Sequence, residues 1–397
     1  MVQTAIFTLT SELHDEQAVD AVTKDFLGSL GIDHLFKGSD YSDYGNHTLN
    51  LIFVRTGGTE GIFKALLPKL REKSGRPFYL LTSGKSNSLA ASMEILSYLR
   101  QNHLSGEIIH GSPEYITSRI LLLEKVEGAR KKMNGSRLGI IGKPSDWLIS
   151  SYADADVVKQ RLGIELVDVP MNTLLDTIAV IPEEMPSESS DREMIRKSLP
   201  GANRIYKALR DIIDKQQLQG FTLRCFDLLS TVKNTGCLAL AKLNSEGFVA
   251  GCEGDVPAML SMKIIQSFTG LSGFQANPSA IDPETGEILF AHCTIPLNMV
   301  ERYEFDTHFE SGIGVGIRGY MKEGAVTVFK VSGDLSRSFI AEGTLVRNLS
   351  KPDLCRTQQV IQLSDKSQAS YFLTNPIGNH HIIVPGCWKS LLEEILK

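Results

Sequence analysis

The sequence predicts an α/β protein with two doubly wound, parallel-sheet domains followed by a smaller β-rich, barrel-like domain. In the first two thirds of the chain, apolar β-rich runs alternate with polar loops and amphipathic helices, as in parallel sheets covered on both faces. From about residue 286 the pattern changes to short β-like segments with frequent glycines, which is typical of an antiparallel barrel or sandwich. We expect domains at residues 1–130, 131–285 and 286–397.

The first domain shows two strand–loop–helix units in succession. Residues 48–54 form a β-rich run, and a Gly57-Gly58 turn follows before an amphipathic helix that Thr59 is placed to cap. Residues 77–81 form the next buried strand, and a polar loop leads from it into a helix that ends near Arg100. This repetition predicts a parallel sheet.

The second domain begins with a strand at residues 137–142, and we expect residues 144–147 to open a helix. A polar stretch between residues 180 and 199 predicts a surface loop before a long helix that ends near Gln216. Residues 247–250 predict another strand, followed by an apolar helix over residues 256–268. In the third domain, residues 326–331, 338–340 and 345–347 predict strands.

The bulk composition excludes several classes of function. A length of 397 residues is too great for one compact core, while 42% hydrophobic and 22% charged residues are ordinary for a soluble globular protein. The net charge of −5 predicts no basic face for nucleic acid, and no apolar run is long enough to span a membrane. Six cysteines without a CxxC pair indicate reduced thiols, and the N-terminus lacks a signal-peptide pattern, so we expect a cytoplasmic protein.

Three polar loops follow predicted strands, at residues 55–60, 83–88 and 143–147. Ligands of open α/β sheets bind at the carboxyl ends of the strands, so these loops are candidate substrate contacts. Turn formation explains their Gly, Ser and Asn residues equally well, and none matches a phosphate-binding or dinucleotide motif. The candidate side chains in them are Arg55, Lys85, Asn87, Asp146 and Trp147.

Two carboxylates, Glu253 and Asp255, lie between glycines where a predicted strand meets a helix. Close like charges repel unless a cation or a substrate lies between them, so the pair indicates a polar site. Asp255 has an alternative role as the N-cap of the helix. Glu253 has no such structural role and is the better candidate for chemistry.

Four histidines lie in stretches that also supply Gly, Asn or carboxylate groups: His292, His308, His380 and His381. Neighbours in an extended segment face opposite ways, so at most one of His380 and His381 can face a given ion. Glu310 adds a carboxylate close to His308. Grouped with Glu253, these side chains predict a mixed oxygen and nitrogen site for Mn²⁺ or another divalent cation.

At these residues the chain resembles the L-fucose isomerase and L-arabinose isomerase superfamily, in particular the shorter fucose-isomerase-like proteins. The resemblance covers most of the chain and is strongest in residues 222–227, 251–262, 291–294, 308–316 and 378–383. It implies Rossmann-like N-terminal and central domains, a β-rich C-terminal domain and bound Mn²⁺. It also implies a homo-oligomer, a trimer or hexamer, with active sites shared between subunits.

The resemblance also implies roles for individual residues. Glu253 matches a metal ligand that is also the catalytic acid/base, with Asp255 as its assistant, and the position of a second acidic ligand is Asn277. His308 and His381 match metal-binding histidines, and His292 matches a position that faces the substrate. The resemblance implies that His380 either contacts the substrate or orders the residues around the ion. The position of the arabinose enzyme's second catalytic glutamate is Ile295.

The function implied is an aldose–ketose isomerase that acts on a monosaccharide through an enediol. Such a reaction needs a base to move a proton between neighbouring carbons and a cation to hold their oxygens. Two alternatives stay open. Asn277 and Ile295 favour a non-catalytic sugar-binding or regulatory protein on the same scaffold, and a related metal-dependent epimerase or lyase would use the same chemistry. The sequence does not name the sugar.

Overall fold

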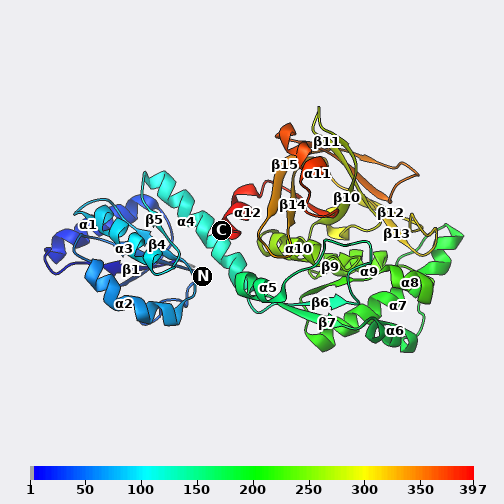
Figure 1. Cartoon of the computed structure of the whole chain (residues 1–397), viewed down its shortest axis with the longest axis horizontal. Helices are drawn as coiled ribbons and strands as arrows, with labels where there is room; N and C mark the ends of the chain where they lie inside the picture. Colours follow the sequence, from blue (N-terminus) through cyan, green and yellow to red (C-terminus); the bar gives the residue numbers. More distant parts are fainter. Residues whose placement is uncertain (1–3) are drawn as a thin grey trace. The chain divides into compact units, whose positions relative to one another are not determined.

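The computed structural model describes residues 4–397. These residues form two compact units, and the boundary between them in the sequence lies between Lys131 and Lys132 (Figure 1). The predicted fold class is confirmed: each unit contains a parallel sheet with helices, and the second unit also contains a closed barrel. The division into three domains at about residues 130 and 285 stays a prediction.

The first unit is built on a five-stranded parallel sheet in the order β2-β1-β3-β4-β5. All six residues of β3 are buried, because helices cover both faces of a doubly wound sheet. The strands and helices expected around residues 48–101 are confirmed. The elements are β1 (Thr4–Leu9), α1 (Glu16–Leu30), β2 (Leu35–Gly38), β3 (Leu49–Val54), α2 (Glu60–Lys73), β4 (Phe78–Leu81), α3 (Ser88–Gln101), β5 (Gly106–Ile109) and α4 (Pro113–Met133).

The second unit begins with a four-stranded parallel sheet in the order β7-β6-β8-β9. The polar loop before a long helix is confirmed, because α7 begins after it and ends at Gln216. The elements are β6 (Arg137–Ile141), α5 (Ala155–Leu162), β7 (Glu165–Val169), α6 (Met171–Val180), α7 (Glu193–Gln216), β8 (Gly220–Leu223), α8 (Phe226–Thr231), α9 (Cys237–Ser245), β9 (Val249–Cys252) and α10 (Val256–Thr269).

The prediction that residues 144–147 open a helix is wrong. These residues form an irregular loop, and α5 begins only at Ala155, where the Asp154 side chain caps it. The backbone N–H of Ser145 donates to the Glu253 carbonyl, and Asp146 pairs with Arg224. These contacts with residues far away in the sequence hold the loop in a non-helical path with a turn at residues 145–148, which local helix propensity does not predict.

The remaining strands form a closed six-stranded barrel in the order β10-β11-β16-β15-β14-β17, beside a β12-β13 hairpin. The segments expected at residues 338–340 and 345–347 are one strand, β15, whose pairing with β16 is interrupted by a bulge. The elements are β10 (Phe274–Asp282), β11 (Glu287–His292), η1 (Leu297–Met299), β12 (Arg302–Asp306), β13 (Gly316–Tyr320), β14 (Gly324–Val331), β15 (Ser338–Leu349), β16 (Thr357–Leu363), η2 (Lys366–Ser370), α11 (Tyr371–Thr374), β17 (His381–Pro385) and α12 (Lys389–Ile395).

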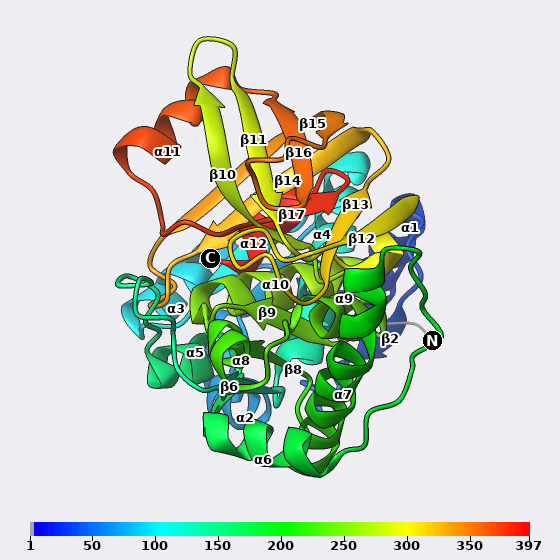
Figure 2. The ribbon, with the colours of Figure 1, turned by 90° about the vertical axis from the view of Figure 1, so that its right-hand side faces the viewer.

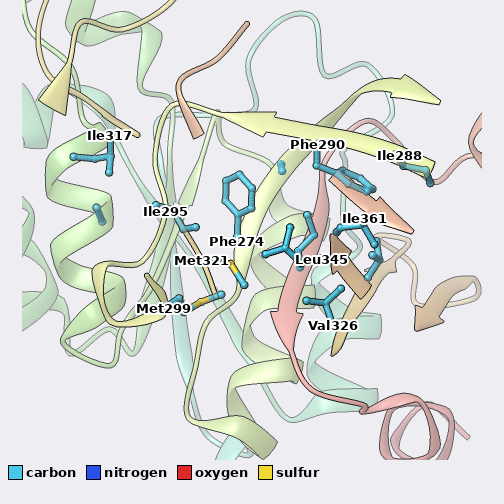
Figure 3. Packing of buried hydrophobic residues seen from close by; sticks show 14 of the residues in the cluster. Phe274, Ile288, Phe290, Ile295, Met299, Ile317, Met321, Val326, Leu345 and Ile361 are labelled. Atoms are coloured by element: carbon cyan, nitrogen blue, oxygen red, sulfur yellow. The ribbon is translucent and has the colours of Figure 1, made fainter. Parts of the chain in front are cut away.

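The inside of the barrel and the hairpin beside it share one apolar core. Figure 3 shows Phe274, Phe290 and Leu345 among its members, together with Ile295 from the segment that follows β11. Ile295 is 1% exposed. The position at which the arabinose enzyme carries its second glutamate therefore packs in an apolar core and offers no carboxylate.

Helices α9 and α10 lie between the four-stranded sheet and the barrel (Figure 2). Helix α10 is apolar around most of its circumference, because it packs on β8 and β9 and also on β14 and β17. Its N-terminus therefore lies where the end of β9 meets the barrel. Among residues 4–397, none of the helices combines the length and the apolar composition needed to cross a lipid bilayer.

Candidate functional site

Glu253 follows β9 in a sharp, strained turn. Its φ of 62° and that of Gly254, 72°, both lie in the left-handed region. A Cβ on Gly254 would lie 2.5 Å from the carbonyl oxygen of Lys143, so only glycine fits there. Glutamate pays a conformational penalty of about 1–3 kcal/mol in such a conformation, and such strain is concentrated at functional sites.

Glu253 lies beside two buried histidines that arrive from the barrel. Its Oε1 is 3.6 Å from Nε2 of His292, at the end of β11, and 3.5 Å from Nε2 of His380, just before β17. One ligand atom from each of these three residues lies within 4.8 Å of the others. The three side chains thus form a compact group at the carboxyl end of the parallel sheet.

The charges in this group stabilise one another. Burial alone raises the pKa of the Glu253 carboxyl, but the charge of His380 and the close approach of both imidazole rings outweigh it and hold that pKa well below its ordinary value. Burial likewise favours the neutral form of His380, but Glu253 and Asp255 outweigh it and raise the pKa of His380 to about 9. Without a metal ion, the site is therefore a carboxylate paired with an imidazolium.

Two buried ring nitrogens at the site, Nδ1 of His292 and Nε2 of His380, have no hydrogen-bond partner among the described residues. Buried polar atoms normally have a partner, so Nε2 of His380, unpaired beside the Glu253 carboxylate, indicates a missing ligand. One carboxylate oxygen and two imidazole nitrogens are a donor set that suits Mn²⁺ and similar divalent cations. The residues therefore fit the divalent cation that the sequence predicts.

His308 lies at the edge of the group, in the loop between β12 and β13. Its ring makes an edge contact with Phe226 at 5.5 Å, and Phe226 makes another with Trp147 at 4.7 Å. Burial and the nearby His292 lower the pKa of His308 to about 4, so the ring is neutral near pH 7. A neutral imidazole is able to bind either a cation or a sugar hydroxyl.

Trp147 and Asp146 come from the loop after β6. The Trp147 Nε1–H donates to Oε2 of Glu253 at 2.8 Å, although the side chain is half-exposed. Asp146 points instead to Arg224, whose Nη2 is 2.8 Å from Oδ2. The hydrogen bond from Arg224 is the main cause of the lowered pKa of Asp146. Trp147 therefore contacts the Glu253 carboxylate directly, whereas Asp146 forms an ion pair with Arg224.

Glu310 is exposed in the same loop as His308. Burial of part of its carboxyl and the charge of Glu253 raise the pKa of Glu310 above its ordinary value. Glu310 is therefore an accessible carboxyl near the site that holds its proton more tightly than a free side chain does.

Asp255 is 0% exposed and does not face a cleft. Its Oδ1 accepts from the N–H of Ala258, which makes Asp255 the N-cap of α10, and its Oδ2 accepts from Nδ1 of His380 at 2.9 Å. Lys330, on β14, lies 3.3 Å from both oxygens and is 1% exposed. Lys330 is not among the residues predicted from the sequence, although a lone lysine in an apolar strand was a usable signal.

Both ring nitrogens of His381 have partners other than Glu253, so His381 does not join the group around Glu253. His381 pairs with Ala276 of the neighbouring strand β10, and its ring packs against aromatic core residues, with its Nε2 3.0 Å from the hydroxyl of Tyr371. Strand alternation thus turns His380, not His381, toward Glu253. The amide oxygen of Asn277 accepts a hydrogen bond from the Asn379 side chain at 3.0 Å.

Three predicted substrate contacts, Arg55, Lys85 and Asn87, belong to the first unit. These residues lie on two loops, and a hydrogen bond from the N–H of Gly57 to the Ser86 carbonyl links the two. Lys85 and Asn87 are exposed, whereas Arg55 is buried and held by Thr10 and Asp20. Arg55 lines a cavity of about 700 Å³ at the carboxyl end of the first sheet.

Part of the second unit matches the model of a known protein family. Residues 146–269 match the model of the L-arabinose isomerase central domain, a range that includes Trp147, Glu253 and Asp255. The chain is 23% identical over 264 residues to the sulfoquinovose isomerase of Priestia aryabhattai, which covers 62% of this chain and 59% of that protein.

Two further sulfoquinovose isomerases are similarly related. The protein of Alkalicoccus urumqiensis is 22% identical over 261 residues, and that of Clostridium sp. (strain MSTE9) is 23% identical over 279 residues. These matches cover 62% and 64% of this chain and 59% and 61% of the respective relatives. The chain therefore spans about three fifths of the length of the curated relatives that it matches.

Proposed function

The chain belongs to the L-fucose and L-arabinose isomerase superfamily, and on this premise we propose that it is a metal-dependent aldose–ketose isomerase acting on a monosaccharide. The observation that carries the proposal is the buried group of Glu253, His292 and His380 at the carboxyl end of the sheet, with its two unpaired ring nitrogens. In this proposal Oε1 of Glu253 and one nitrogen of each histidine hold the cation. When bound, the ion would act as a Lewis acid toward the oxygens on C1 and C2 of the sugar, one a carbonyl and the other a hydroxyl oxygen.

Glu253 performs the proton transfer between carbons in this mechanism. Its carboxyl is ionised at neutral pH, because its pKa is held low, and it is therefore ready to accept a proton from the carbon beside the carbonyl. Trp147 holds Oε2 through its indole N–H, so the side chain keeps one orientation while the proton moves. Glu253 then returns the proton to the neighbouring carbon.

A second group must move the hydroxyl proton between the two oxygens. Asp255 cannot do so, because it is fully buried and both its oxygens have partners. We assign the role to Glu310, whose carboxyl is accessible and whose pKa is raised. A carboxyl with a raised pKa gives and takes protons more readily near neutral pH than an ordinary one.

The substrate class is a hexose or pentose, either deoxy or substituted. The relatives described as sulfoquinovose isomerases make sulfoquinovose the first anionic sugar to assay, beside neutral aldoses such as L-fucose and L-arabinose. We also propose a cytoplasmic homo-oligomer, a trimer or hexamer, with shared active sites. Six free cysteines support a reducing compartment.

The direct test is isotope exchange. The protein is incubated with Mn²⁺ in D₂O with each sugar, and the products are read by NMR. Deuterium at C1 or C2 together with ketose formation is expected. Sugar binding without exchange would instead support the non-catalytic alternative that Ile295 and Asn277 favour, and an epimer without ketose would support an epimerase.

Glu253→Gln provides the matching prediction for a single residue. The amide keeps the size of the side chain but cannot take up a proton, so we expect kcat to fall by about 10²–10⁴-fold with an unchanged circular dichroism spectrum. Glu323→Gln, at an exposed position outside the site, is the control and should leave kcat unchanged. Near-normal turnover by Glu253→Gln would remove Glu253 from the mechanism.

A further inference from the structure

Three buried side chains from separate parts of the second unit form a chain behind the proposed ion site. Lys330 comes from β14, Asp255 from the start of α10, and His380 from the residue before β17. Lys330 contacts Asp255, Asp255 contacts His380, and His380 faces Glu253. None of the three is more than 1% exposed, so water does not screen these contacts.

The two oxygens of Asp255 have different partners. Oδ1 accepts from the Ala258 N–H at the start of α10, and Oδ2 accepts from His380. A carboxylate can only accept hydrogen bonds, so Nδ1 of His380 must carry the proton. When the ring carries a single proton, Nε2 therefore keeps its lone pair, and it is this nitrogen that lies 3.5 Å from Glu253.

Lys330 holds the carboxylate of Asp255 in one orientation. Its Nζ lies 3.3 Å from each carboxylate oxygen, so it holds the carboxylate in place without occupying the positions used by Ala258 and His380. A buried ion pair of this kind is seldom more stabilising than an apolar pair of similar size. Stability alone therefore gives no reason for a lysine here, and a role in positioning does.

We propose that Lys330 and Asp255 form a positioning pair that fixes the proton of His380 on Nδ1 and directs Nε2 at the cation shared with Glu253 and His292. The pair touches neither substrate nor ion, and it acts only through His380. This inference rests on the proposed function, because it assumes that a divalent ion binds between these three residues. It replaces the proton-transfer role expected for Asp255 from the sequence.

The double variant Asp255→Asn with Lys330→Met tests the pair. It removes one negative and one positive charge together, so the net charge of the buried region does not change. Methionine fills the space of the lysine stem, and asparagine keeps the shape of aspartate. Ala258 and His380 donate to different oxygens of Asp255, and asparagine has an oxygen at only one of these two positions. If the oxygen stays on Ala258, the amide NH₂ faces Nδ1 of His380 and forces the proton onto Nε2, which can then no longer bind an ion.

The measurement is Mn²⁺ affinity of the metal-free protein, from the electron paramagnetic resonance signal of free Mn²⁺. We expect the double variant to fold and to bind Mn²⁺ about 10–100-fold more weakly than the wild type, the usual loss when a partner of a metal-binding histidine is removed. Lys263→Met is the matched control. Lys263 is also buried, and its side chain bonds to Gln266 on its own helix, so its replacement should leave Mn²⁺ affinity unchanged.

The outcomes separate the two proposals. If the wild type binds Mn²⁺ and the double variant binds it equally well, the positioning pair is refuted and the proposed function stands. If the wild type does not bind Mn²⁺, both fail.

A second measurement does not depend on a variant that folds. In wild-type protein containing ¹⁵N-histidine and diamagnetic Zn²⁺, NMR should find the His380 proton on Nδ1. A proton on Nε2 would overturn the inference.

Discussion

The two carboxylate oxygens of Glu253 have different surroundings. Oε1 faces His292 and His380, whereas Oε2 accepts the indole N–H of Trp147. One oxygen is thereby available to a cation and the other is held by a neutral donor. In the proposed mechanism Oε1 would bind the ion, and Oε2, which keeps a second lone pair beside the Trp147 hydrogen bond, would carry the proton.

Trp147→Phe tests this division. Phenylalanine keeps the edge contact with Phe226 but removes the N–H donor, so Glu253 loses its orienting bond. We expect kcat to fall about tenfold, because a hydrogen bond to a charged group contributes about 1.5–3 kcal/mol when buried and less at a half-exposed residue. Steady-state kinetics distinguish the roles: a raised KM with unchanged kcat would mean that Trp147 binds substrate instead.

The raised pKa of His380 predicts that cation binding depends on pH. An imidazolium has no free lone pair, so below pH 9 the cation must displace a proton from His380. Mn²⁺ affinity should therefore rise by up to about tenfold per pH unit between about pH 6.5 and 8.5. Titrations at several pH values check this, and an affinity independent of pH would exclude His380 as a ligand.

The stability of the metal-free protein should change in the opposite direction. The folded pKa of His380 is above the unfolded value of about 6.5, so its stabilisation is fully present below pH 6.5 and is lost as pH rises through about 9. Glu253, whose pKa is lowered, stays ionised in both states across this window and adds no slope. Thermal melts between about pH 6.5 and 9 should show a falling midpoint.

At the scale of elements, the turn between β9 and α10 positions the whole site. It orients Glu253 toward the histidines and Asp255 toward the barrel, and it depends on the left-handed conformation of Gly254. Where Gly254 approaches Lys143, the turn also fixes the loop that carries Trp147. A change in this turn therefore disturbs several site residues at once.

Gly254→Ala and Gly270→Ala form a matched pair for this turn. Both glycines have a φ above 70°, but a Cβ at Gly270 meets no atom within 4 Å, whereas one at Gly254 would lie 2.5 Å from the Lys143 carbonyl oxygen. We expect Gly270→Ala to lower the free energy of unfolding by about 1 kcal/mol, and Gly254→Ala by several kcal/mol more with loss of activity. Denaturant titrations measure both, and equal effects would contradict the argument.

Local signals predicted most elements because apolar runs and turn residues coincide with them. The strand before Gly57-Gly58 and the helix after Asp255 follow from the sequence alone. The loop at residues 144–147 did not, because its path is set by Glu253 and Arg224, which are distant in the chain. Local propensity contains no information about such partners.

The candidate site was predictable in its residue types but not in their orientations. Glu253, His292 and His380 were all named from the sequence, and the structure brings them together. The choice between His380 and His381 depends on the pairing of β17 with β10, and a one-residue shift in that pairing reverses every side chain. Sequence alternation alone does not fix this register.

At the scale of the whole molecule, the described residues form two compact units, and the candidate cation site lies wholly in the second. A ligand that binds only the folded form stabilises the unit that contains its site. Mn²⁺ at about 100 times its Kd should therefore add about 2.7 kcal/mol to the stability of that unit. Calorimetry should show one transition that rises with Mn²⁺ and falls after chelation, and a second that stays constant.

The long separation of Asp255 from His380, 125 residues along the chain, has a consequence during synthesis. At about 5–20 residues per second, a ribosome needs roughly 6–25 seconds to make that stretch. Strand β17 follows every other barrel strand in the sequence, so the barrel closes around His380 last. With the proposed ligand set, a nascent chain that carries Glu253 but not yet His380 would lack one of the three ligands, so ion binding would follow closure of the barrel.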